Sequence, residues 1–275
     1  MTIVRENDNL IISDFGKINL PLTLDCGQAF RWEKRSDGFW HGVTGDFCPK
    51  IRQEGQRLYI KNVEEGQDLY SLLDYLDLYR DYSFLLDSFC KDEKLYNAIQ
   101  KYGTIRILNQ DPWETLCSFI ISACNHIPRI KSIIRALCCN FGQELEQGEF
   151  SFPSAEKIAS LSLDEISVIR AGYRHEYILD AARLVASGQI DFSVLRTADT
   201  DYARCELMKI KGVGKKVADC TLLFGLRHAD AFPTDRHIKR FVSENYPSGL
   251  PECISVAPGI AQQYMFCIQR EQSQG

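Results

Sequence analysis

The spacing of apolar residues changes near residue 80, and this change restricts the chain to folds that join a small sheet to a larger set of helices. Before that point, short apolar runs alternate with turn residues, mostly glycine and aspartate. The runs are Leu10–Ile12, Gln28–Trp32, Phe39–Val43 and Arg57–Ile60. Short runs bounded by such residues are typical of antiparallel strands, so we expect a small antiparallel sheet over residues 1–82.

Helical patterns dominate from residue 83 onwards. Asp111 followed by Pro112 is a helix start signal, and Ser162 has the spacing to Glu165 of a capping box. Breaks near residues 142, 188, 211–214 and 247–251 predict several short helices. We therefore expect an α+β protein, with an N-terminal antiparallel β domain over residues 1–82 and a mostly helical region over residues 83–275.

Composition excludes several classes of protein. The 275 residues are 45% hydrophobic and 25% charged, as in a globular protein of one or two domains. No segment reaches the ~18 consecutive apolar residues of a membrane span, and Arg5, Glu6 and Asp8 precede any apolar run that could act as an export signal. We expect no membrane partner and an intracellular location, in a bacterial cytoplasm or, in a eukaryote, the nucleus.

The cysteines and histidines argue against disulfides and against a metal site. The chain has 11 cysteines, and an intracellular location favours reduced thiols. No Cys-x-x-Cys occurs, and the 5 histidines are scattered without a ligand spacing. We therefore expect no bound metal.

Positive charge is concentrated in one segment. Residues 203–242 contain nine basic and four acidic side chains, within a chain whose formal net charge is -5. Such a region favours contact with a nucleic-acid backbone, and a solvated helix face is the alternative that the charges alone leave open.

Two glycines interrupt the helical pattern inside that segment. Gly212 and Gly214 lie between two helical stretches within residues 203–226. This arrangement predicts a helix-hairpin-helix, because glycines allow a tight turn and the amides at the start of the second helix can face a phosphate.

The second of these helices contains two neighbouring lysines that point in different directions. At about 100° per residue, Lys215 lies near Asp219, opposite the apolar side of the helix. Lys216 lies at the edge of the apolar side, about one turn before Cys220, where a partly desolvated amine suits nucleophilic attack. Lys216 is therefore the chemical candidate.

A second chemical candidate follows a proline. Asp235 in Pro233-Thr234-Asp235-Arg236-His237 precedes a new helical pattern, so it can cap that helix. The same carboxylate can face a positively charged transition state, and His237 near the helix start is available to phosphates.

These two segments resemble the helix-hairpin-helix (HhH-GPD) DNA glycosylases, and within them the 8-oxoguanine DNA glycosylases. The matching motifs are Gly-Val-Gly-Lys-Lys-Val-Ala-Asp-Cys at 212–220 and Pro-Thr-Asp-Arg-His at 233–237. The resemblance implies that Lys216 attacks the sugar C1′ of a flipped nucleotide and forms a Schiff base, while Asp235 stabilises the oxocarbenium-like charge. It also implies strand cleavage by β-elimination, and hence a bifunctional enzyme.

The resemblance extends to a base pocket. Residues 25–32 resemble the family's Gly-Gln-x-Phe-Arg-Trp segment, in which the carbonyl of the glycine, here Gly27, accepts a hydrogen bond from the N7–H of oxidised guanine. Gln262 and Phe266 lie on one helical face and match the residues that read and stack on the base, opposite Cys220. The resemblance also places Pro233 in this pocket.

Further matches imply contacts with duplex DNA. Gly172-Tyr173-Arg174 resembles the family's wedge tyrosine and cytosine-reading arginine, and Arg129 matches the second arginine, which implies a lesion opposite cytosine. Where the family has a plug asparagine this chain has Cys124, with Asn125 beside it. The other residues assigned to DNA are Gly212, Gly214, Val217 and His237. The implied partner is double-stranded DNA containing oxidised guanine, bound by a monomer.

The resemblance implies little in the way of cofactors. Some relatives hold an iron–sulfur cluster with four cysteines after the catalytic aspartate, but only Cys253 and Cys267 follow Asp235 here. We expect no cluster, and at most a monovalent cation on the hairpin carbonyls.

Two other functions compete with 8-oxoguanine excision. An alkylation-damage glycosylase without lyase activity would need Asp235 but not Lys216, Gly27 or Gln262. A non-catalytic DNA-binding module would need only the hairpin.

Overall fold

The computed structural model of the protein describes residues 1–64, 66–146 and 148–272. Its strands are β1 (Thr2–Glu6), β2 (Asn9–Ser13), β3 (Trp32–Lys34), β4 (Trp40–Gly42), β5 (Lys50–Glu54), β6 (Arg57–Lys61), β7 (Glu144–Glu146) and β8 (Glu149–Phe150). Its α-helices are α1 (Leu20–Asp25), α2 (Gln67–Tyr75), α3 (Ser83–Phe89), α4 (Glu93–Tyr102), α5 (Pro112–Ser122), α6 (Ile127–Phe141), α7 (Ala155–Ala159), α8 (Leu163–Ile166), α9 (Arg174–Ala186), α10 (Phe192–Thr197), α11 (Thr200–Leu207), α12 (Lys215–Gly225), α13 (Arg236–Asn245) and α14 (Pro258–Gln272). Two 3₁₀ helices are η1 (Ser167–Ile169) and η2 (Glu252–Ile254).

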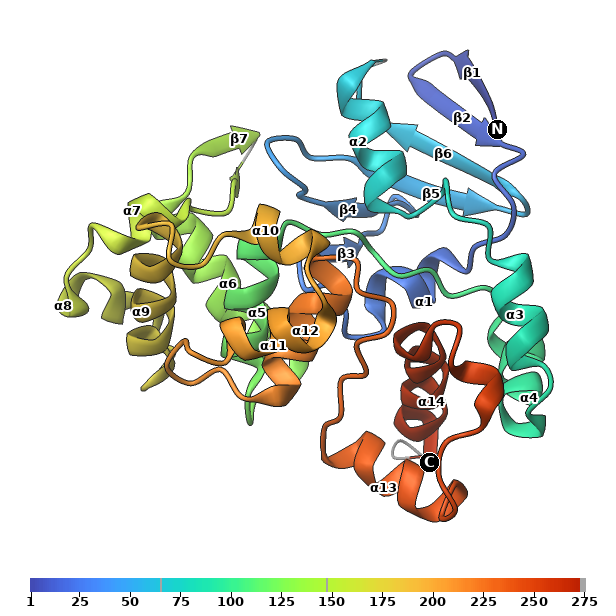
Figure 1. Cartoon of the computed structure of the whole chain (residues 1–275). Helices are drawn as coiled ribbons and strands as arrows, with labels where there is room; N and C mark the ends of the chain where they lie inside the picture. The colour runs from blue at the N-terminus through green and yellow to red at the C-terminus, as the bar shows by residue number, and fades with distance from the viewer. Residues whose placement is uncertain (65, 147, 273–275) are drawn as a thin grey trace.

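The N-terminal region is an antiparallel sheet, as predicted. Its six strands lie in the order β1-β2-β6-β5-β4-β3, and the register pairs Ile51 with Ile60 and Ile12 with Leu58. These side chains are fully buried, and they form one core with the leucines of α2, which lies beside the sheet in Figure 1. The sequence patterns missed β1, β5 and the helices α1 and α2.

The expected strand over Gln28–Trp32 is wrong for all but its last residue. Only Trp32 belongs to a strand, and residues 28–31 form an irregular segment. The reason is the buried side chain of Gln28, which donates to the carbonyls of Thr23 and Arg106 (both 2.8 Å) and accepts from the amide of Leu108 (2.9 Å). This side chain takes the place of a strand partner and ties the segment to residues 106–108.

The helical region consists of two groups of helices. Helices α5 to α12 lie on one side in Figure 1, and α13 and α14 lie on the other beside α3 and α4, which come from a distant part of the chain. Helix α5 is apolar on all sides and is buried between α12, α6 and α9. The two helical groups share one core that also includes Cys26 and Phe30 from the N-terminal region.

The predicted helix starts are present. Asp111 caps α5, Ser162 forms the capping box of α8 with Glu165, and Asp235 caps α13. The predicted breaks are also present, since α6 ends at Phe141, α9 at Ala186 and α11 at Leu207. The division at residue 82 stays a prediction, because the two cores meet along residues 26–32 and 104–111.

Candidate active site

The residues expected to carry chemistry line one pocket of about 150 Å³. The pocket is lined by the segment after α1, by α5, α6 and α12, by the connection from α12 to α13, and by α14. Its lining includes Gly27, Asn125, Lys216, Cys220, Pro233, Asp235, Gln262 and Phe266. A larger cavity of about 400 Å³ between β3–β4 and α6 contains neither Lys216 nor Asp235.

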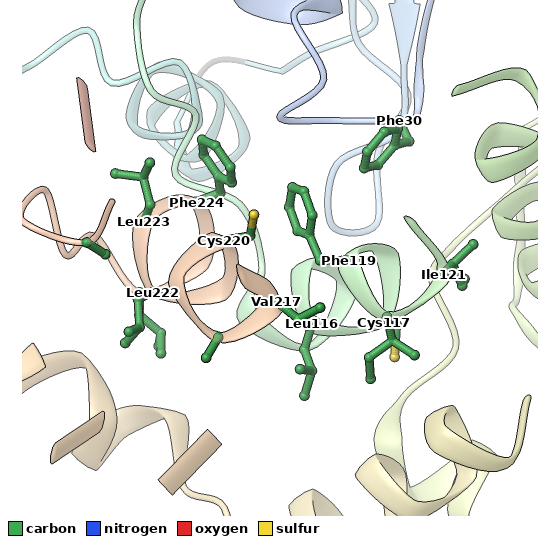
Figure 2. Packing of buried hydrophobic residues seen from close by; sticks show 14 of the residues in the cluster. Phe30, Leu116, Cys117, Phe119, Ile121, Val217, Cys220, Leu222, Leu223 and Phe224 are labelled. Atoms are coloured by element: carbon green, nitrogen blue, oxygen red, sulfur yellow. The ribbon is translucent and has the colours of Figure 1, made fainter. Parts of the chain in front are cut away.

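Lys216 points into the pocket. Its Nζ donates to Ser122 Oγ (3.2 Å) and lies 4.7 Å from the centroid of the Phe119 ring. Figure 2 shows that ring between Phe30 on one side and Cys220 and Phe224 on the other. The amine is therefore half-buried against aromatic carbon rather than extended into solvent, which suits a nucleophile.

Cys220 forms the pocket wall one turn after Lys216. Burial raises the pKa of its thiol to about 11, an effect that the adjacent Lys216 partly opposes. Cys220 therefore remains a neutral thiol at neutral pH, and it adds an apolar surface to the pocket.

Asp235 caps α13 and also lines the pocket. Its Oδ1 accepts from the amides of His237 (2.9 Å) and Ile238 (2.8 Å). Both bonds fall on the same oxygen, and within the described ranges no bond is found on Oδ2. One carboxylate thus holds the helix start and still presents an oxygen to the pocket.

Gly27 faces Phe266 across the pocket. The backbone of Gly27 has a φ of +84°, and a Cβ placed on it would lie 3.5 Å from the Phe266 ring. The left-handed conformation is what requires glycine here, since the contact distance itself is ordinary. A planar group between the Phe266 ring and Gly27 would need about 3.5 Å on each side, so the ring must move before such a group can enter.

Gln262 is buried and hydrogen-bonded rather than solvent-exposed. It is 4% exposed, and its Oε1 accepts from Nε2 of the neighbouring Gln263 (2.8 Å). Gln263 Oε1 in turn accepts from the thiol of Cys26 (3.2 Å). This chain of hydrogen bonds links α14 to the segment that carries Gly27.

Comparison with known proteins identifies the family. A profile of the 8-oxoguanine DNA glycosylase N-terminal domain matches residues 10–116. The structure of MBOgg1 with a low-affinity DNA ligand has a TM-score of 0.91 and 38% identity over 99% of each chain. The Clostridium acetobutylicum 8-oxoguanine glycosylase/lyase, solved with double-stranded DNA containing cytosine opposite 8-oxoG, has a TM-score of 0.91 and 31% identity, again over 99% of each chain. The chain belongs to the 8-oxoguanine DNA glycosylase family.

A curated relative agrees with this placement. The N-glycosylase/DNA lyase of Saccharomyces cerevisiae is 29% identical over 264 residues, which cover 82% of this chain and 68% of the yeast protein.

The hairpin of this 8-oxoguanine DNA glycosylase family member lies between α11 and α12. Gly212 has a φ of +81°, and a Cβ there would lie 2.1 Å from the Tyr177 ring, so only glycine fits. Gly214 has an ordinary φ of -94° and is the N-cap of α12. Apart from Gly214 and its two chain neighbours, no described atom lies within 4 Å of the Cβ position of Gly214, and no side chain caps α12, so the first amides of α12 are open to a ligand.

Most cations of the positive segment have a carboxylate partner. Six of the nine basic side chains in residues 203–242 form ion pairs, and they are Arg204, Lys209, Lys211, Lys215, Arg227 and Arg240. Lys215 pairs with the fully buried Asp219 (2.7 Å), as its predicted place on α12 requires. The pairs of Lys211, Arg227 and Arg240 are exposed on both sides and therefore weak, so phosphates can compete for these three cations.

The family's expected DNA-contact residues differ in accessibility. Tyr173 is 52% exposed, as a wedge requires, and Arg129 is exposed. Arg174 instead stacks on Tyr173 and donates through Nε to the carbonyl of Ala123 (3.0 Å). The guanidinium of Arg174 must therefore leave that carbonyl before it can contact a base.

Two more of these expected contacts are limited by packing. The Asn125 side chain donates to the carbonyl of Ile121 (2.8 Å) at the pocket, beside the exposed Cys124, whose φ is +54°. The Val217 side chain is buried, so only its backbone amide is left for DNA. His237 lies at the start of α13, next to Arg236.

Sequence reasoning missed several residues of the pocket, and four of them contact or support predicted residues. Phe119 and Ser122 contact the Lys216 amine, and Cys26 and Gln263 support Gln262. Cys26 and Gln263 each adjoin a predicted residue, but adjacency did not indicate that these two side chains would meet.

Over the described ranges, no cluster of three or more His, Cys, Asp or Glu side chains is placed to hold a metal ion. No helix in the same ranges has the length and apolar character to cross a membrane.

Proposed function

We propose that this protein is a bifunctional DNA glycosylase and AP lyase that excises 8-oxoguanine, paired with cytosine, from duplex DNA. The observation that carries the proposal is the convergence of Lys216, Asp235, Gly27, Gln262 and Phe266 on one pocket. An alkylation-damage glycosylase would not need the amine in the pocket, and a phosphate-binding module would not need the pocket.

Lys216 is the nucleophile in this proposal. Its neutral amine attacks C1′ of the flipped nucleotide, the bond from C1′ to N9 breaks, and the base leaves with the bonding electrons and takes up a proton. Nζ then loses a proton and the C1′–O4′ bond of the sugar ring breaks, with O4′ taking up a proton, which leaves a protonated Schiff base between Nζ and C1′. This Schiff base allows loss of a C2′ proton and expulsion of the 3′-phosphate, which cuts the strand. Hydrolysis then frees Lys216.

Asp235 stabilises positive charge on the sugar as the base departs. Its Oδ1 is held by two backbone amides, so the carboxylate is oriented before the reaction. A fixed negative charge that needs no reorganisation stabilises an oxocarbenium-like transition state.

The base pocket supplies selection for oxidised guanine. The Gly27 carbonyl accepts from the N7–H that 8-oxoguanine has and guanine lacks, while Phe266 stacks on the base and Gln262 reads its Watson–Crick edge. The Phe266 ring lies 3.5 Å from the Gly27 Cβ position, so base insertion requires the ring to move away from Gly27.

The duplex is held by the hairpin and by the α5–α6 and α8–α9 connections. The first amides of α12 bind a phosphate, His237 contacts another, and Tyr173 enters the stack while Arg129 and Arg174 contact cytosine. The hairpin carbonyls are oxygen donors of the kind that hard cations take, and a monovalent cation there is part of the proposal. The compartment is the one that holds chromosomal DNA, the nucleoid of a bacterium or the nucleus of a eukaryote.

Borohydride trapping tests this function directly. The substrate is a duplex with one 8-oxoguanine opposite cytosine, and the proteins are the unaltered chain, Lys216→Gln and Lys215→Gln. Lys215 is the matched control, because it adjoins Lys216 but pairs with Asp219 outside the pocket. We expect a covalent adduct with the unaltered chain and with Lys215→Gln, and none with Lys216→Gln.

Other results would contradict specific parts of the proposal. Base release without any adduct would remove the lyase step and favour a monofunctional glycosylase. DNA binding with neither product would favour the binding module.

A further inference from the structure

A chain of four buried side chains leads from the N-terminal region to the base-reading glutamine. Gln28, Cys26, Gln263 and Gln262 are each 4% exposed or less. Gln28 Nε2 lies 3.5 Å from Cys26 Sγ, Cys26 Sγ lies 3.2 Å from Gln263 Oε1, and Gln263 Nε2 lies 2.8 Å from Gln262 Oε1. These contacts connect residues 237 positions apart in the chain.

The orientation of the first amide in the chain is set by backbone groups. Gln28 Nε2 donates to the carbonyls of Thr23 and Arg106, and Gln28 Oε1 accepts from the amide of Leu108. Rotating this amide by 180° would place N–H against N–H and oxygen against oxygen, all in a buried site. Gln28 therefore presents a nitrogen, never an oxygen, to Cys26.

The Cys26 thiol in turn fixes the orientation of the Gln263 amide, because it donates to Gln263 Oε1. Burial raises the pKa of Cys26 far above its ordinary value, so the sulfur keeps its proton. Since Gln28 offers only a donor, the single S–H points to Gln263, which must present Oε1. The Gln263 Nε2 then faces Gln262 and donates to its Oε1.

The geometry assigns Gln263 as a positioning residue: we propose that it holds the Gln262 amide in one orientation and so makes the pocket select a 6-oxopurine edge over a 6-aminopurine edge. This inference rests on the proposed function, and it adds the residue that orients the base-reading amide.

The selectivity follows from the donors and acceptors that remain on Gln262. Its Nε2 is left to donate into the pocket, and its Oε1 keeps one lone pair to accept. A 6-oxopurine presents an acceptor at O6 and a donor at N1–H, which match this pair. A 6-aminopurine presents a donor and an acceptor in the reverse order. A freely rotating amide would serve both bases, whereas a fixed amide serves one.

The test compares two bases that differ only in this edge. Duplexes carry 8-oxohypoxanthine or 8-oxoadenine opposite cytosine, and both bases keep the N7–H that faces Gly27. In Gln263→Met, which keeps the side-chain length without hydrogen bonds, we expect the ratio of kcat/KM for the oxo base over the amino base to fall by about tenfold or more. Cleavage of a preformed abasic site, which needs no base reading, is expected to stay within about twofold.

Matched variants separate positioning from general loss of packing. Tyr264→Phe removes a fully buried hydroxyl from the same helix. That hydroxyl bonds to the backbone of residues 103 and 105, and it makes no bond to Gln28, Cys26, Gln263 or Gln262. The ratio in this variant should equal that of the unaltered protein. Cys26→Ser keeps a donated proton and should keep the ratio, while Cys26→Ala removes the proton and should lower it.

The outcomes are distinguishable. An unchanged ratio in a folded Gln263→Met, or an equal fall in Tyr264→Phe, would overturn the positioning role while excision itself continues. If the unaltered protein releases no 8-oxopurine and gives no borohydride adduct, the proposed function itself fails.

Discussion

At the scale of single residues, adjacent positions in α12 have different roles because of helical geometry. Lys215 and Lys216 are separated by about 100° around the helix axis. Lys215 reaches the buried Asp219, whereas Lys216 reaches Ser122 and the Phe119 ring. The local pattern was sufficient to place the two lysines on different sides of the helix, since the sequence shows which side is apolar.

Substitutions of Asp235 can separate its role as the N-cap of α13 from its proposed role in stabilising positive charge on the sugar. Asparagine caps helices about as well as aspartate, so Asp235→Asn should change the free energy of unfolding by less than about 0.5 kcal/mol. Loss of the negative charge should slow base release by about 10²- to 10³-fold in single-turnover assays on 8-oxoguanine DNA. Thermal unfolding and base release measured on the same preparation check both statements.

The Asp235→Ala variant serves as the comparison. It loses the cap as well, and should cost about 1 kcal/mol of stability in addition to the activity. An Asp235→Asn protein that releases base at the unaltered rate would remove Asp235 from the chemistry.

At the scale of elements, the hairpin uses its two glycines differently. Gly212 is needed for the fold, because its φ is positive and its Cβ position overlaps the Tyr177 ring. Gly214 has a common helix-cap conformation, and its surroundings are open. The sequence marked both glycines but could not divide these roles, since the division depends on α9 packing beside the turn.

The element-scale prediction exploits this difference. Gly214→Ser should preserve or slightly raise the melting temperature, because serine is a better N-cap than glycine. Its hydroxyl would occupy amides that a phosphate needs, so we expect DNA affinity to fall by about three- to tenfold in fluorescence anisotropy at fixed salt.

Gly212→Ala provides the contrast. The clash and the positive φ should lower stability by about 2 kcal/mol or more. Unchanged DNA affinity in a folded Gly214→Ser protein would argue against phosphate binding at this helix start.

At the scale of the whole molecule, buried thiols link stability to alkaline pH. Burial raises the pKa of Cys48, Cys220 and Cys267 from 9.0 to about 11 in each case. The unfolded chain therefore loses these protons first, so the stabilisation is complete below about pH 9 and is lost as the pH rises towards 11.

This loss should amount to on the order of 1 kcal/mol at pH 10 for each of Cys220 and Cys267, and to less for Cys48, whose thiol is better screened by solvent. We expect the melting temperature, measured with a reductant present, to fall steadily between pH 9 and 10.5. Cys48→Ala should make the decline shallower, while Cys205→Ser, at an exposed position, should leave it unchanged. A flat profile over this range would contradict the prediction.

The sequence by itself determined the local features of this protein. These features depend on neighbours within a few residues, so short sequence patterns predict them. They are the helix caps Asp111, Ser162 and Asp235, the turn at Gly212, and the inward direction of Lys216. The α+β class followed from the same patterns, and motif resemblance supplied the base-pocket residues.

Only the tertiary structure decided how distant segments meet. It replaced the expected strand at residues 28–31 by a buried glutamine, held Arg174 against a carbonyl, and oriented Gln262 through Cys26 and Gln263. These outcomes depend on which buried polar groups form hydrogen bonds with one another in the folded protein. Such partners can be 237 residues apart, so the local spacing of apolar residues does not predict them.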